Sequence, residues 1–132
     1  LGRAVAAALG SAGLALLIGK VLGMLVMRPR PFVAHPEVHD FLRHAADNSF
    51  PSDHATASFA IAGALVLHYR RWAVPLLGAA VVLAYARVLL GVHYPSDVVA
   101  GLLLGATVTL LALAVFDPLP RAAGAHRTTI AP

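Results

Sequence analysis

The residues whose types and spacing favour chemistry most clearly are Arg87, His93 and Asp97, in the pattern Arg-x5-His-x3-Asp. Arg87 lies in an apolar stretch, where a charged side chain is costly and marks a functional candidate. Asp97 is close enough to accept a hydrogen bond from a ring nitrogen of His93. Such a bond fixes the imidazole tautomer and leaves the other nitrogen free to attack. The alternatives are a helix cap for Asp97 and an ordinary loop histidine.

A second group, Phe50-Pro51-Ser52-Asp53-His54, stands directly before another apolar segment. Ser52 or Asp53 can cap a helix that begins here, and the free backbone N–H groups of that helix can bind an anion. His54 then lies in the first turn, beside the anion. Taken alone, the group is explained as well by capping, with His54 an incidental polar residue.

The third group is Arg28-Pro29-Arg30-Pro31. Its prolines end the preceding helix and hold two guanidinium groups where they can bind phosphate oxygens or lipid headgroups. Together the three groups supply three arginines, two histidines, the aspartate beside His93 and a helix N-terminus. This set suits phosphoryl transfer through a phosphohistidine, in which one histidine attacks phosphorus, another protonates the leaving oxygen and cations stabilise the charge.

Four apolar segments must position these groups, and they cover residues 1–27, 55–69, 72–90 and 98–116. A spanning helix needs about 20 residues, so the second segment spans only if protein buries the turn before it. We therefore predict an all-α, polytopic membrane bundle with about four transmembrane helices. Because Leu1 lies inside an apolar run, we expect further helices before it. We also expect a membrane domain over 1–117 and a polar tail over 118–132.

Small residues recur at helical spacing in two of these segments, as Gly19-x-x-x-Gly23 and Gly101-x-x-x-Gly105. In an apolar helix this spacing permits close packing against a neighbouring helix.

The composition is 59% apolar and 12% charged, with a mean hydropathy of +0.79. A soluble domain carries about 25% charged residues, so this balance favours a membrane protein. No cysteine is present, which excludes a disulfide framework and a thiolate metal site. The formal charge of +4 favours lipid headgroups or phosphate. Nine aromatic residues are too few for a base-stacking platform, and we expect no nucleic-acid partner. Protein partners are left open.

Alternating helices place 28–54 and 91–97 on one membrane face. The other face receives Arg3, Arg70, Arg71, Arg121 and Arg127. The positive-inside rule makes that second face cytoplasmic. We therefore expect the face with the three groups to look outward, with Arg30 and Arg87 on that face explained by a phosphate substrate.

In order and spacing, the three groups resemble the motifs of the type 2 phosphatidic acid phosphatase superfamily, which also includes the vanadium haloperoxidases. Lys-x6-Arg-Pro, Pro-Ser-Gly-His and Ser-Arg-x5-His-x3-Asp appear here as Arg30-Pro31, Pro51–His54 and Ala86–Asp97. The motif lysine falls at Gly23, although Lys20 lies one turn earlier. Asp53 replaces the motif glycine, and Ala86 replaces the motif serine.

Segments 28–32 and 44–54 are similar in particular to the bacitracin-resistance type of undecaprenyl pyrophosphate phosphatase, which also tends to lack the lysine and carry the aspartate. The resemblance implies that His93 is the nucleophile, Asp97 its partner and His54 the general acid. It further implies phosphate binding by Arg30, Arg87 and the Ser52–Asp53 region, with Lys20 as a further candidate. It implies a metal-independent reaction without a cofactor.

The predicted function is hydrolysis of a polyprenyl diphosphate, favouring undecaprenyl, to the monophosphate, which recycles the carrier lipid for the cell wall. Arg28, Arg43 and His44 are predicted to lie over the second phosphate. One alternative is a phosphatase for phosphatidic acid or phosphatidylglycerol phosphate. Another is a metal-binding or transport protein using His35, His39, His44, Glu37 and Asp40. A third is a weakly active fragment.

Overall fold

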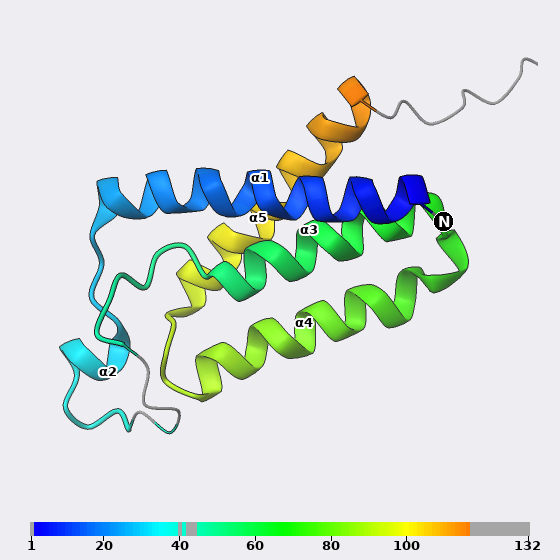
Figure 1. Cartoon of the computed structure of the whole chain (residues 1–132). Helices are drawn as coiled ribbons and strands as arrows, with labels where there is room; N and C mark the ends of the chain where they lie inside the picture. The colour runs from blue at the N-terminus through cyan, green and yellow to red at the C-terminus, as the bar shows by residue number, and fades with distance from the viewer. Residues whose placement is uncertain (1, 40, 42–44, 117–132) are drawn as a thin grey trace, which may run out of the picture.

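The computed structural model describes residues 2–39, 41 and 45–116, and its long elements are all helices (Figure 1). They are α1 (Gly2–Val26), α3 (Asp53–His68), α4 (Ala73–Leu89) and α5 (Pro95–Phe116), with the short α2 (Pro31–Ala34) and η1 (Arg70–Trp72) between them. Each of the four predicted apolar segments forms one long helix. The prediction of an all-α bundle is confirmed.

Within the described residues, three segments are long and apolar enough to cross a membrane: α1, Arg70–Leu89 and α5. The fourth helix, α3, has 16 residues and lies at the centre, in contact with α1, α4 and α5. Small buried side chains such as Ala55, Ala60 and Ala64 let its neighbours approach. The chain is therefore a multi-pass membrane protein built around a short central helix.

Glycines on α5 allow that central helix to pack closely. A Cβ atom built on Gly101 would lie 2.7 Å from the Ser52 carbonyl oxygen, and one on Gly105 would lie 3.0 Å from the Ala60 nitrogen. A Cβ on Gly23 would lie 2.7 Å from the Phe50 carbonyl oxygen, so α1 also passes close to the segment before α3. The predicted role of the spaced glycines in close packing is confirmed.

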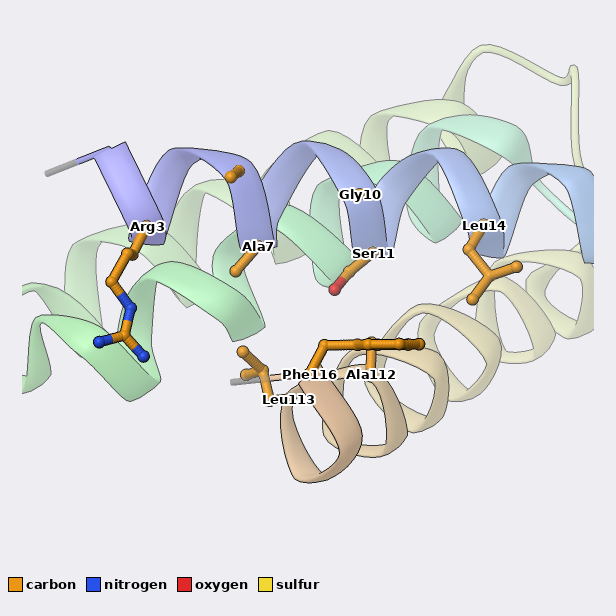
Figure 2. A pocket seen from close by; sticks show the side chains of 9 residues that line it. Arg3, Ala7, Gly10, Ser11, Leu14, Ala112, Leu113 and Phe116 are labelled. Carbon is orange, nitrogen blue, oxygen red and sulfur yellow. The ribbon is translucent and has the colours of Figure 1, made fainter. Parts of the chain in front are cut away.

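The two ends of the bundle hold different segments of the chain. One end holds α2 and the linkers 27–30 and 90–94, while the N-terminus of α1 and the connection between α3 and α4 lie at the other (Figure 1). At this second end, a largely apolar cavity of about 420 Å³ separates α1 from the last turns of α5. Arg3, Ser11, Leu14 and Phe116 are among its lining residues (Figure 2).

Candidate active site

The N-termini of α3 and α5 meet at the end that carries the three sequence motifs. Ser52 is the N-cap of α3, where its side chain accepts a hydrogen bond from the Ala55 N–H at 3.4 Å. The Ser52 N–H itself donates to the carbonyl oxygen of Asp97 at 3.0 Å, in the first turn of α5. The predicted cap is confirmed, and the bond joins the second motif directly to the third.

The turn after α4 brings His93 back toward Arg87. The helix stops at Leu89, and Gly91 adopts a φ of 69°, a left-handed conformation that suits glycine. This turn lets the N–H groups of Val92 and His93 both donate to the Arg87 carbonyl oxygen, each at 3.3 Å. The side chains of Arg87 and His93 are 7% and 4% exposed, so a charged and a titratable group are buried together.

The hydrogen bond predicted between His93 and Asp97 is not formed. The Nδ1 atom of His93 lies 2.8 Å from the Ser49 carbonyl oxygen and 3.9 Å from Asp97 Oδ2. The expectation from the x3 spacing was wrong in this detail because other donors occupy the Asp97 carboxylate. A ring nitrogen bonded to a carbonyl must carry its proton, so the Nδ1–H tautomer is assigned to His93.

The Asp97 carboxylate is fully buried and accepts hydrogen bonds at both oxygens. Oδ1 accepts from Nη1 of Arg28 at 2.8 Å. Oδ2 accepts from the Ser49 hydroxyl and from the Tyr94 N–H, both at 2.9 Å. The bond to Tyr94 also caps the start of α5, so the capping role considered for Asp97 is present together with its contacts to the site.

Arg30 places a positive charge beside the Nε2 atom of the His93 imidazole. Its Nη1 atom donates to the Val92 carbonyl oxygen at 3.1 Å and lies 3.3 Å from Nε2 of His93. Its Nε atom donates to Asp47 Oδ1 at 2.7 Å, and this aspartate side chain is 63% exposed. The guanidinium group is thus fixed on the His93 side and paired with an anion on the solvent side, where a phosphate oxygen can replace the carboxylate.

Burial lowers the pKa of His93 to about 4, and the positive charges of Arg30 and Arg87 act in the same direction. The hydrogen bond to the Ser49 carbonyl and the negative charge of Asp97 oppose this shift. The imidazole is therefore neutral at physiological pH. Because Nδ1 carries the proton, the lone pair of Nε2 is available beside Arg30, as nucleophilic attack requires.

The remaining predicted residues lie around this centre. Asp53 and His54 are exposed in the first turn of α3, and Lys20 is exposed on α1. Lys20, Arg28 and Asp53 line one cavity of about 600 Å³ beside the site. Arg43 and His44 lie outside the described residues. The structure thus brings Arg30, Arg87, His93, Asp97 and Ser52 together, whereas Lys20 and Asp53 line a neighbouring cavity and His54 is exposed on α3.

Ser49 is a site residue that sequence reasoning missed. Its hydroxyl contacts Asp97, and its carbonyl oxygen contacts His93. A backbone carbonyl is present at every residue and leaves no trace in the sequence. The one available signal was the position of Ser49 beside the Pro51–His54 motif.

In the histidine-rich linker, the described histidines contact neighbouring side chains of the linker itself. His35 forms an ion-pair contact of 3.6 Å with Glu37, and the ring of His39 packs against Phe41. Within residues 2–39, 41 and 45–116, no group of three or more potential ligands is close enough to hold a metal ion. Asp40 and His44 lie outside these residues.

Fold and site together define a class: helical membrane proteins with a buried neutral histidine facing arginines and a helix N-terminus. The family model described as PAP2 superfamily matches residues 4–121. The chain belongs to the PAP2 superfamily.

Among its relatives is the "Putative undecaprenyl-diphosphatase YbjG" of Escherichia coli, 47% identical over 68% of this chain and 46% of the relative. The "Undecaprenyl-diphosphatase BcrC" of Bacillus subtilis is 39% identical over 77% of this chain and 53% of the relative. The chain spans about half the length of these curated relatives.

Solved structures of the same architecture include LpxE of Aquifex aeolicus, with a TM-score of 0.78 at 27% identity. The match covers 86% of this chain and 68% of that protein. A PAP2-type phosphatidylglycerolphosphate phosphatase from Bacillus subtilis gives a TM-score of 0.67 at 29% identity, covering 88% of this chain and 60% of that protein.

Proposed function

We propose that this chain forms the catalytic part of an integral-membrane phosphatase that hydrolyses undecaprenyl diphosphate to the monophosphate and inorganic phosphate. The observation that carries the proposal is the state of His93. It is buried and neutral, its Nδ1 proton is donated to Ser49, and Nε2 faces Arg30. The names of the relatives from Escherichia coli and Bacillus subtilis support a polyprenyl diphosphate as the substrate.

In the first step, Nε2 of His93 attacks the terminal phosphorus. The N–P bond forms while the bond from phosphorus to the bridging oxygen breaks, and this oxygen takes a proton from His54 as it leaves with the lipid monophosphate. Arg30, Arg87 and the N–H groups at the start of α3 stabilise the charge on the equatorial oxygens. Water then attacks the phosphorus, His54 accepts its proton, and the electron pair of the N–P bond returns to Nε2.

A diphosphate needs more positive charge than a monophosphate because it presents more anionic oxygens. Lys20 and Arg43 are the cations proposed to supply it, Lys20 from the cavity beside the site. The runner-up substrate is phosphatidylglycerol phosphate, supported by the similarity to the Bacillus subtilis structure.

A phosphate-release assay with the full-length protein, in detergent with added lipid, tests the substrate. Undecaprenyl diphosphate should be cleaved faster than phosphatidic acid and phosphatidylglycerol phosphate at equal surface concentration. His93→Ala should abolish release from every lipid, and Arg71→Ala, at the opposite end of the bundle, should leave it unchanged. Faster hydrolysis of phosphatidic acid would overturn the carrier-lipid proposal, while activity in purified His93→Ala protein would overturn the mechanism.

We propose that no metal ion takes part, because arginines and a helix N-terminus already supply positive charge to the phosphate. Activity should survive a chelator, and vanadate should inhibit as a mimic of five-coordinate phosphorus. Loss of activity in chelator, restored by one particular metal ion, would instead favour the histidine-rich linker as a metal site.

The proposed location is the bacterial inner membrane with the site facing outward. Arg70 and Arg71 lie between α3 and α4, at the end opposite the site, as the positive-inside rule requires of a cytoplasmic face. Residues 1–132 contain no cysteine, so Ala46→Cys and Trp72→Cys each add one thiol, and the protein without either substitution is the labelling control. An impermeant thiol reagent should label Ala46→Cys in whole cells and leave Trp72→Cys unlabelled. The opposite pattern would reverse the orientation.

A further inference from the structure

The geometry points to Arg28 as a positioning residue, which holds the proposed nucleophile in place through Asp97 and Ser49. This replaces the sequence-based prediction that Arg28 binds the second phosphate of the substrate. The inference rests on the proposed role of His93. It assigns to the first arginine of Arg28-Pro29-Arg30-Pro31 a task different from that of the second.

The guanidinium group of Arg28 contacts residues at the start of α5. Its Nη1 atom donates to Asp97 Oδ1 at 2.8 Å and to the Ser96 hydroxyl at 2.6 Å. Its Cζ atom lies 4.0 Å from the centre of the Tyr94 ring, as in a cation–π contact. Three residues of one turn therefore hold this side chain, whereas the partner of Arg30 Nε is the exposed carboxylate of Asp47.

The backbone of Arg28 reaches His93 by a second route. Its carbonyl oxygen accepts a hydrogen bond from the Ser49 N–H at 2.8 Å, and its own N–H donates to Asn48 Oδ1 at 2.9 Å. Ser49 then donates its hydroxyl to Asp97 and offers its carbonyl oxygen to His93 Nδ1. Ser49, whose carbonyl oxygen fixes the His93 tautomer, is thus held through its N–H by Arg28 and through its hydroxyl by Asp97.

Arg28 also balances the charge of Asp97, which is wholly buried. Three charged groups act on His93: Arg30 from the linker after α1, Arg87 from α4 and Asp97 from α5. Of these, the negative charge of Asp97 raises the pKa of His93. Without Arg28 this buried charge has no cation beside it, so the pKa of the His93 imidazole should rise.

The experiment compares Arg28→Gln, Arg28→Lys and the control Arg71→Gln in the full-length protein. We expect Arg28→Gln to lower kcat by up to about 100-fold and to change KM by less than about twofold, because misplacing a catalytic group slows chemistry without removing a substrate contact. The pKa of His93, followed by NMR of ring-labelled histidine, should rise in Arg28→Gln and return toward the original value in Arg28→Lys. Arg71→Gln should change none of these quantities.

A double-mutant cycle distinguishes a positioning role of Arg28 from direct binding of phosphate. If Arg28 acts through Asp97, Arg28→Gln should have little further effect on kcat in an Asp97→Asn background. A raised KM for the diphosphate with an unchanged kcat, or additive effects in the cycle, would overturn the inference and restore Arg28 as a phosphate ligand. If Arg28→Gln fails to fold, Arg28→Lys still decides by the direction of any residual effect: a lowered kcat with KM unchanged supports positioning, and a raised KM with kcat unchanged supports a phosphate contact. Activity in His93→Ala would instead overturn the proposed function, and the NMR result would remain interpretable.

Discussion

The two ends of the bundle treat a buried serine hydroxyl in opposite ways. At the site end, Ser49 is wholly buried and donates its hydroxyl to Asp97 at 2.9 Å. At the other end, Ser11 is 2% exposed, and its hydroxyl has no hydrogen-bond partner among the described residues. Ser11 lines the cavity between α1 and α5, whose other lining residues are mostly apolar (Figure 2).

This difference shows where the bundle fixes its geometry. Dispersion contacts between Ala, Leu and Val side chains are not directional, so apolar helices can slide relative to one another at little cost. Hydrogen bonds from Arg28 and Ser49 to Asp97 require one arrangement of the α1–α2 linker, the segment before α3 and the start of α5. The site end is therefore specified by polar contacts, and the cavity end by packing that leaves a void.

Glycine substitutions should produce the largest contrast between the ends. In Gly101→Leu the new side chain meets the Ser52 carbonyl oxygen, 2.7 Å from the ideal Cβ, and the Thr56 hydroxyl. Overpacking of this kind costs about 1–3 kcal/mol or more, so thermal unfolding in detergent should occur at a clearly lower temperature. Gly10→Leu is the matched control, because Gly10 lines the cavity and nothing lies within 4 Å of a Cβ atom built on it. Equal losses in both variants would remove the contrast.

Serine substitutions give a smaller and more specific effect. Ser49→Ala removes one hydrogen bond from a buried carboxylate and should destabilise the protein by about 1–3 kcal/mol while lowering kcat. Ser11→Ala removes a buried hydroxyl without a described partner and should change stability by less than about 0.5 kcal/mol, with activity retained. Thermal unfolding and phosphate release measure both. A Ser11→Ala protein as damaged as Ser49→Ala would show that the cavity end is also specified by polar contacts.

The smallest expected change is the response of His93 to mild acid. Because burial and two arginines hold its pKa at about 4, lowering the pH from 7 to 5.5 should leave the ring almost entirely neutral. A histidine with the ordinary pKa of about 6.5 would be mostly protonated at pH 5.5. NMR titration of ring-labelled protein measures this. A midpoint for His93 near the ordinary value of about 6.5 would contradict the described burial and charge.

Much of this architecture could be predicted from the sequence. Runs of about 20 apolar residues force helices in a membrane, since lipid offers no partner for the backbone. The spaced glycines indicated close packing, and the three motifs indicated which loops share one face. Ser52 at the start of α3 followed from ordinary N-cap preferences.

The hydrogen-bond pairing inside the site could not be predicted. Sequence spacing placed Asp97 within reach of His93, but which donor reaches a carboxylate first depends on tertiary contacts between residues up to 69 positions apart, as for Arg28 and Asp97. For the same reason, the Nδ1–H group of His93 donates its hydrogen bond to the Ser49 carbonyl oxygen and not to Asp97. Two arginines separated by one proline also look equivalent in sequence, although one contacts α5 and the other faces the imidazole.

The most direct test of the central claim is to trap the phosphorylated enzyme. Full-length protein is mixed with undecaprenyl diphosphate labelled in its terminal phosphate, quenched in alkali within one turnover and digested for peptide mapping. We expect an acid-labile, alkali-stable label on the peptide that contains His93, absent from His93→Gln protein and present in the Arg71→Gln control. A label on another residue, or full turnover in His93→Gln without any label, would contradict it.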